Sequence, residues 1–303
     1  MAPSIRLSNT ETRVFHTGET LYRVIAADDI GPHNVAKGDR GGWASGMHHF
    51  IGDNVWVGGD ATVRGHALLD DAAAVGGVAD ISDHAFMYGN AYAGGCTEMS
   101  GTASAGGHAR LADNAALGGD ADISGHAFMH GNAYAGDNTV MSDNASAGGF
   151  SLLSDNAALE DGASITGHAV LRDNATVGGT ARLSGFSVVG GDATVTNGRI
   201  GGRARLLGSA VVDTPAVLVG HAVVDCPYGY IFIGPVGHSR VTVTCADTAD
   251  GGQVTFIADA KTTTLHIDDA REFAAAVDDK EKSAAFPNLP DAVELVVAWA
   301  ASR

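Results

Sequence analysis

Residues 57–92 read VGGDAT, VRGHAL, LDDAAA, VGGVAD, ISDHAF and MYGNAY, which are six consecutive units of six residues. In each unit the first position is Val, Leu, Ile or Met, the third is Gly or Asp, and the fifth is Ala. The same register runs without a gap from Ile51 to Thr194, then passes a five-residue unit, VTNGR, and resumes as far as Val223. Repetition over so much of a chain governs its fold, because each repeat stacks on its neighbours.

The hexad period separates inward from outward side chains. The fifth position and the following first position lie two residues apart, so on an extended chain they share one face and the sixth position points the other way. Gly, Asn and Asp at the second to fourth positions tolerate positive φ and tight corners. Each hexad is therefore expected to form one short strand and one corner. The sequence predicts an all-β solenoid of hexapeptide repeats over residues 51–223.

The two ends of the chain depart from the period and are expected to cap the solenoid, since an open end would expose a template for edge pairing. Residues 1–50 should contain a hairpin that turns at Thr17 and Gly18. The C-terminal cap, residues 224–303, is expected to be a small α/β unit. Its strands are predicted near Tyr230–Gly234, Arg240–Thr244 and Val254–Ala258. Two helices are predicted at Asp269–Lys282 and Pro290–Ala301.

Three segments carry a family resemblance: LYRVIAADD at 21–29, KGDRGGW at 37–43 and GDNVW at 52–56. Together with the hexads they resemble bacterial and phage hexapeptide-repeat proteins of the YdcK type, which are labelled acetyltransferases. The resemblance covers nearly the whole chain and includes residues 230–237 and 265–273. It implies a left-handed parallel β-helix in which three hexads wind into each triangular coil.

The resemblance also implies a possible activity. Hexapeptide-repeat acyltransferases are homotrimers with active sites between subunits, a His as general base, and an acyl coenzyme A as substrate. On that alternative, acetyl coenzyme A is the cofactor, and the candidate bases are His108, His126 and His168. This sequence departs from that pattern because no loop interrupts the hexads between residues 51 and 223. Without the transferase, no cofactor is expected.

Composition narrows the partners. The formal net charge of −17 disfavours nucleic-acid backbones and anionic membranes, which bind clustered Lys and Arg. The three cysteines are odd in number and widely spaced, so they form neither a disulfide framework nor a CxxC metal site. No apolar run approaches the roughly 18 residues of a membrane span. We expect a cytoplasmic protein that contacts neither nucleic-acid backbone nor membrane.

Histidines recur at the fourth hexad position. His48, His66 and His84 are each separated by three hexads, as are His108 and His126. Stacked rings could hold a metal or act as a base. The same columns continue with Asn, Asp and Thr, so we interpret the histidines as corner residues that tolerate positive φ, and we predict no metal site. Protonating the stacked rings is expected to loosen the early coils.

The outward sixth position suggests an interface. With three hexads to a coil, one column of apolar residues falls on consecutive coils: Ala116, Tyr134, Leu152, Val170 and Val188. A contiguous apolar strip on a surface commonly marks an interface, although outward β-branched residues also occur singly. The column predicts a homo-oligomer, with a trimer favoured, or a protein partner.

The sequence supports one main interpretation and two alternatives. The main interpretation is a non-catalytic scaffold or binding protein that presents its β-helix faces and C-terminal cap to a partner. The first alternative is a hexapeptide-repeat acyl transferase. The second is an acidic decoy for a DNA-binding protein, which would use the negative charge of the chain, or a phage-encoded inhibitor.

Overall fold

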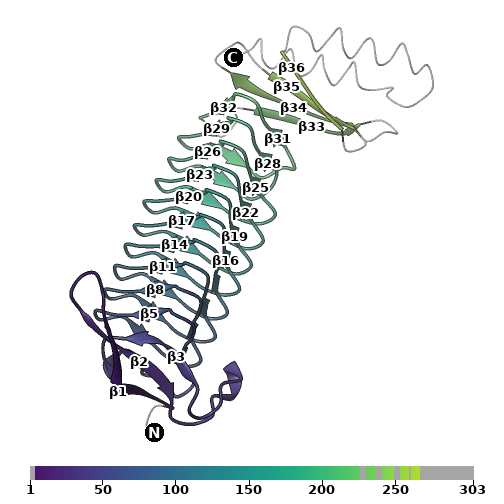
Figure 1. Ribbon diagram of the computed structural model, residues 1–303. Coiled ribbons are helices and arrows are strands. Elements are labelled where there is room, and N and C mark those ends of the chain that lie inside the picture. Colours follow the sequence, from purple (N-terminus) through teal and green to yellow (C-terminus); the bar gives the residue numbers. More distant parts are fainter. Residues whose placement is uncertain (1–3, 226–229, 237–240, 249–252, 259–260, 267–303) are drawn as a thin grey trace. The chain divides into compact units, whose positions relative to one another are not determined.

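A computed structural model describes residues 4–225, 230–236, 241–248, 253–258 and 261–266. The chain divides into two compact units, Met1–Gly162 and Ala163–Arg303, which are described separately. Both are built from coils of very short parallel strands (Figure 1). The predicted all-β solenoid is confirmed. The only helical elements among the described residues are two single turns, η1 (Gly31–His33) and η2 (Met47–His49).

The first unit begins with an antiparallel hairpin that continues into the coils (Figure 1, purple). Strands β1 (Ile5–Val14) and β2 (Thr20–Ala26) flank the turn at Gly18, as predicted. Strand β3 (Arg40–Ala44) pairs antiparallel with β2 and parallel with β5 (Thr62–Val63) of the coils. The hairpin and the coils therefore share one continuous sheet. We call residues 4–50 the N-terminal cap.

The coils of the first unit have three faces, each a ladder of two-residue parallel strands. The β4 face consists of β4 (Trp56–Val57), β7 (Ala74–Val75), β10 (Tyr92–Ala93), β13 (Arg110–Leu111), β16 (Phe128–Met129) and β19 (Ser146–Ala147). The β5 face consists of β5 (Thr62–Val63), β8 (Asp80–Ile81), β11 (Glu98–Met99), β14 (Ala116–Leu117), β17 (Tyr134–Ala135) and β20 (Leu152–Leu153). The β6 face consists of β6 (Leu68–Leu69), β9 (Phe86–Met87), β12 (Ser104–Ala105), β15 (Asp122–Ile123), β18 (Val140–Met141) and β21 (Ala158–Leu159).

Strand pairing confirms that three hexads make one coil. Tyr92 pairs with Arg110, and Arg110 with Phe128, so each partner lies three hexads further along the chain. The second residue of each strand and the Ala four residues later form the core; Leu111 and Ala115, for example, are both 0% exposed. The first residue of each strand points outward, as the hexad period predicts.

Corners depend on the third hexad position. From Gly59 to Gly191 every third-position residue is Gly or Asp and has φ between 53° and 74°. Gly has no Cβ to clash there, and Asp is one of the few other residues that tolerate this region. At several corners the Asp carboxylate also accepts a hydrogen bond from the next coil; Asp113 Oδ2 lies 2.9 Å from the backbone nitrogen of Gly131. The corner residue therefore sets both the turn and part of the coil stacking.

The second unit has the same coil design. One face consists of β22 (Ser164–Ile165), β25 (Arg182–Leu183), β28 (Arg199–Ile200) and β31 (Val217–Leu218). The next consists of β23 (Val170–Leu171), β26 (Val188–Val189), β29 (Arg205–Leu206) and β32 (Ala222–Val224), and the third of β24 (Thr176–Val177), β27 (Thr194–Val195) and β30 (Val211–Val212). The five-residue unit at Val195 is accommodated in a corner, because Arg182 still pairs with Arg199 across it.

An antiparallel sheet follows the last coil of the second unit. Its strands are β33 (Tyr230–Val236), β34 (Val241–Thr248), β35 (Gln253–Ala258) and β36 (Lys261–His266). The first three were predicted, and β36 was missed. The end of β34 pairs antiparallel with β32, Val223 opposite Asp247, and so joins this sheet to the coils. The two helices predicted at residues 269–282 and 290–301 lie outside the described residues.

Candidate functional site

Part of the predicted apolar column lies on the β5 face of the first unit. Ala116 pairs with Tyr134, and Tyr134 pairs with Leu152. Tyr134 is 43% exposed and Leu152 37% exposed. The Tyr134 ring packs against Gly136, where an added methyl group would lie 2.4 Å from its hydroxyl oxygen. Three successive coils therefore present a continuous apolar strip.

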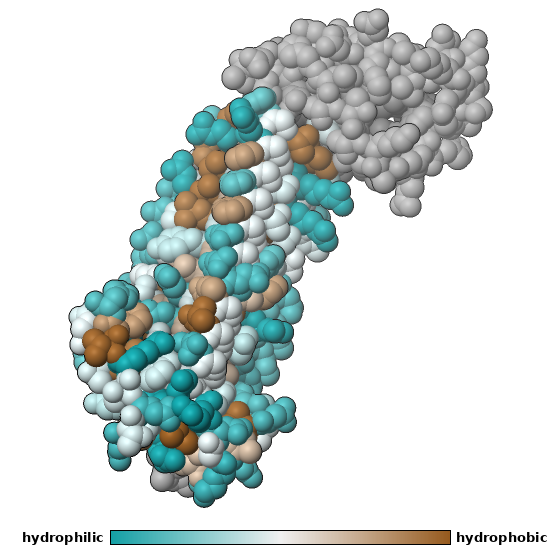
Figure 2. Space-filling view, viewed as in Figure 1, coloured by the Kyte–Doolittle hydropathy of each residue, from teal (hydrophilic) through white to brown (hydrophobic). Residues whose placement is uncertain are grey.

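The remaining two members of the column lie in the second unit. Val170 on β23 pairs with Val188 on β26, and both side chains are half-buried. Figure 2 shows apolar side chains, drawn brown, gathered on the second unit near these two strands. Each unit thus carries its own short apolar strip.

Two phenylalanines that sequence reasoning missed enlarge these strips. Phe150 is 58% exposed and Phe186 is 59% exposed. Each lies in the corner that leads into its strip, two residues before the outward residue Leu152 or Val188. The signal was present in the hexads AGGFSL and LSGFSV, where Phe replaces the usual polar residue at the fourth position.

The three candidate bases do not form one site. His108 and His126 are exposed and stacked, with ring centroids 4.8 Å apart and planes 3° apart. Both lie at corners that lead from the β6 face into the β4 face. His168 belongs to the second unit, at a corner between β22 and β23, where its ring stacks on Phe186 at 4.8 Å. The structure pairs two of the candidates and places the third at a different type of corner.

The stacked histidines are confirmed, but the reason given for them was wrong. The rings of His66 and His84 are 5.0 Å apart, and those of His48 and His66 are 6.3 Å apart. Among the described residues, the non-glycine positions with positive φ are Asn34 and eight third-position aspartates, and none is a histidine. His follows the left-handed residue and does not occupy it. Its presence at the fourth position reflects an outward corner that accepts many polar side chains.

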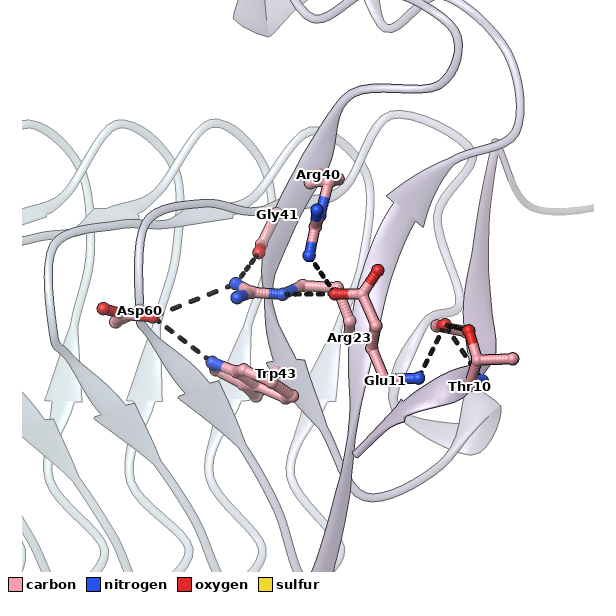
Figure 3. Close-up of polar contacts among 8 residues, drawn as sticks. Thr10, Glu11, Arg23, Arg40, Gly41, Trp43 and Asp60 are labelled. Carbon is pink, nitrogen blue, oxygen red and sulfur yellow. Dashed lines mark hydrogen bonds and ion pairs between the residues drawn. The ribbon is translucent and has the colours of Figure 1, made fainter. Parts of the chain in front are cut away.

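The most interconnected polar group of the described residues lies in the N-terminal cap (Figure 3). The guanidinium of Arg23 lies over the Trp43 ring at 4.0 Å and donates from Nη1 to the carbonyl oxygen of Gly41 at 2.7 Å. Its Nε is 3.6 Å from Glu11 Oε2. Trp43 Nε1 in turn donates to Asp60 Oδ1 at 3.3 Å. These contacts join both hairpin strands to β3 and to the first coil.

Two further arginines extend this cluster. Arg13 lies over the Trp43 ring at 4.7 Å, and partial burial lowers the pKa of its guanidinium. Arg64 Nη2 is 2.7 Å from Asp80 Oδ2, and this hydrogen-bonded carboxylate raises the pKa of Arg64. Arg64 also covers the Phe15 ring at 4.7 Å. Since these cations are engaged by rings or carboxylates within the protein, the cluster is best described as a structural clasp.

A buried histidine completes the junction between the cap and the coils. His49 is 0% exposed; its Nδ1 is 2.7 Å from the carbonyl oxygen of Ala67, and its Nε2 is 2.8 Å from Ser45 Oγ. The carbonyl can only accept, so Nδ1 carries the proton and Nε2 accepts from the Ser45 hydroxyl. Burial lowers the pKa of His49 to about 4. The neutral imidazole is therefore part of the folded structure.

Neither a metal site nor a membrane-spanning helix is found within the described ranges. No three His, Cys, Asp or Glu side chains of these residues gather in a way that could hold a metal ion. A helix with the length and apolarity to cross a membrane is likewise missing from this part of the chain. Comparison with protein-family models and with curated proteins gives no match. The hexapeptide-repeat resemblance therefore stays a prediction beyond the β-solenoid itself.

Proposed function

We propose that this chain is a non-catalytic, self-associating hexapeptide-repeat β-helix protein that acts as a scaffold. The observation that carries the proposal is the exposed apolar strip of the β5 face, where Tyr134 and Leu152 are 43% and 37% exposed on adjacent coils beside Phe150. Val170 and Val188 supply the corresponding pair in the second unit. Burial of such a contiguous apolar surface against a partner is favourable, by about 25 cal/mol for each Å² of apolar area removed from water.

A homotrimer is the proposed assembly, because identical apolar strips can be buried against one another in a closed ring of three copies. The test is the native mass of the full chain by light scattering coupled to gel filtration. The wild type is expected at three times the chain mass. The double variant V170D/V188D is expected to shift towards the monomer, since a buried carboxylate without a partner is costly.

Val211→Asp is the matched control. Val211 is an outward valine of the second unit, 37% exposed, on β30 of a different face. It should leave the mass unchanged. A monomeric wild type, or a double variant with the mass of the wild type, would reject self-association through these strips.

A hexapeptide-repeat acyltransferase that uses acetyl coenzyme A is the second candidate. The observation that favours it is the exposed, parallel pair His108 and His126, whose imidazoles could serve as bases. Acetyl transfer to amine acceptors that disappears in H108A/H126A, but persists in H84A, would support this candidate. The absence of any thiol release from acetyl coenzyme A across an acceptor panel would count against it.

A further inference from the structure

A second surface, distinct from the apolar strips, lies on the β4 face. The outward residues of its successive strands are Trp56, Ala74, Tyr92, Arg110 and Phe128, each paired in register with the next. Aromatic rings therefore occupy every second strand. Neighbouring strands lie about 4.8 Å apart, so the strands that carry the rings recur about every 9.6 Å along the face. We call Trp56, Tyr92 and Phe128 the aromatic ladder.

Glycines beneath the ladder let two of its rings lie against the coil surface. A methyl group at Gly94 would be 2.5 Å from Tyr92 Cε1, and one at Gly76 would be 2.8 Å from the Tyr92 hydroxyl oxygen. A methyl at Gly58 would be 2.9 Å from Trp56 Nε1. Backbone thus lies beneath both rings. The Tyr92 ring keeps an outer side for contact, whereas the Trp56 ring is half-buried and also meets the N-terminal cap. Tyr92 is 37% exposed and Phe128 36% exposed.

The spacing of the rings matches one peptide conformation. A polyproline II helix has three residues per turn and a rise of about 3.1 Å per residue, so it repeats about every 9.3 Å. Over the two intervals of the ladder the mismatch is only about 0.6 Å. We propose that the aromatic ladder binds a proline-rich segment of a partner protein in the polyproline II conformation, with one proline per turn against each ring. Aromatic surfaces bind proline-rich segments well, because a segment that is already in the polyproline II conformation loses little entropy on binding.

The polar groups of the face suit the same ligand. A polyproline II chain makes no internal hydrogen bonds, so its carbonyl groups need donors. Arg110 is exposed, lies between Tyr92 and Phe128, and offers a guanidinium that can only donate; its Cζ is 5.9 Å from the Tyr92 ring centroid. Addition of a β-strand is disfavoured, because the ladder's backbone already pairs between coils: Tyr92 N donates to Ala109 O at 2.9 Å.

Charge defines one end of the proposed ligand. Asp70 and Asp71 form the corner that leads into the Ala74 strand, between the first two rings, and Asp71 is exposed. The chain as a whole carries a formal charge of −17. A basic residue beside the proline-rich segment would therefore be attracted to the Trp56 end of the ladder. The proposed ligand is a proline-rich peptide with a flanking Arg or Lys.

The first experiment is a calorimetric titration of the full chain with a peptide of about nine prolines, roughly three turns, followed by two arginines. Saturable binding is expected, and a peptide of the same length with Gly and Ser in place of Pro should bind at least ten-fold more weakly. No binding at millimolar peptide, or equal binding of the two peptides, would overturn the proposal. Binding of a β-linked glucose oligomer in place of the proline peptide would overturn it as well, in favour of a glycan ligand.

A second experiment tests the spacing itself. The double variant F128S/S146F exchanges two outward residues of neighbouring strands, Phe128 and Ser146, and leaves the composition unchanged. It moves the third ring one coil further, to about 14.4 Å from Tyr92. Affinity for the proline peptide is expected to fall at least five-fold. An unchanged affinity would mean that the rings act as unspecific apolar surface and would reject the ladder.

Phe86→Ala is the matched control for both experiments. Phe86 is an outward aromatic residue of the same unit on the β6 face, where it stacks on Tyr88 at 5.2 Å. Its loss should leave affinity within two-fold, and the far-ultraviolet circular dichroism of every variant must match that of the wild type. If the exchange variant does not fold, Tyr92→Ala serves in its place, with the same loss of affinity expected. A loss of the same size in Phe86→Ala would contradict binding at the ladder.

Discussion

The N-terminal cap and the coils of the first unit are held together in opposite ways. In the coils, contacts of one kind recur and each spans three hexads: Gly131 N donates to Asp113, and Gly89 N donates to Asp71. In the cap, single long-range contacts meet at Arg23 and Trp43, and they do not follow the hexad period. A substitution in a coil therefore removes one of many similar contacts, whereas a substitution in the clasp removes side-chain contacts between the hairpin and the first coil that no repeat duplicates.

The largest effect on stability is expected from Arg23→Ala, which removes the central arginine of the N-terminal cap. The change removes the cation over Trp43 and the donor to the Gly41 carbonyl. Because the Arg23 side chain is largely buried, the loss of its ring contact and of its charged hydrogen bond should lower the free energy of unfolding by roughly 3 kcal/mol. Urea denaturation followed by tryptophan fluorescence measures it. Arg110→Ala, an exposed arginine on a coil, should cost less than about 0.5 kcal/mol, and equal losses would contradict the distinction.

An effect of intermediate size is expected from acid, through His49 at the junction. The pKa of His49 is lowered to about 4 from 6.5, so the folded state favours the neutral ring. The stabilisation is complete above pH 6.5 and is lost as the pH falls from 6.5 towards 4. At pH 5 the loss should be about 2 kcal/mol, visible as a lower melting temperature than at pH 7.

Two variants separate His49 from the stacked histidines. His49→Gln keeps an amide donor for the Ala67 carbonyl but cannot be protonated, so the drop in melting temperature between pH 7 and pH 5 should largely disappear. His84→Gln removes one ring of the exposed His66–His84 stack and should leave most of that drop in place. The opposite result would assign the acid sensitivity to the stacked rings and not to the junction.

The contrast between the N-terminal cap and the coils also explains which parts of the structure could be predicted from the sequence. The coils follow from local rules, because Gly or Asp at a corner and Ala at the fifth position recur in every coil. The clasp could not be predicted, because Arg23, Trp43 and Asp60 are brought together by strand pairing between β2, β3 and the first coil, which no period encodes. The outward apolar column was predicted residue by residue, yet Phe150 and Phe186 were missed since they stand where polar residues usually stand.

The smallest effect on stability is expected at a fifth hexad position that is not Ala. Thr139 occupies the fifth position of the hexad AGDNTV, is 1% exposed, and its Oγ1 has no hydrogen-bond partner among the described residues. A buried hydroxyl without a partner keeps its cost of desolvation, so Thr139→Val should raise the free energy of unfolding by about 1 kcal/mol. Thr102→Val is the comparison, because that exposed hydroxyl donates to the Gly119 carbonyl at 3.3 Å and gains nothing from removal. Thermal unfolding of both variants measures the difference. Stabilisation by Thr102→Val alone would show that the exposed corner hydroxyl, and not the buried one, is the destabilising group.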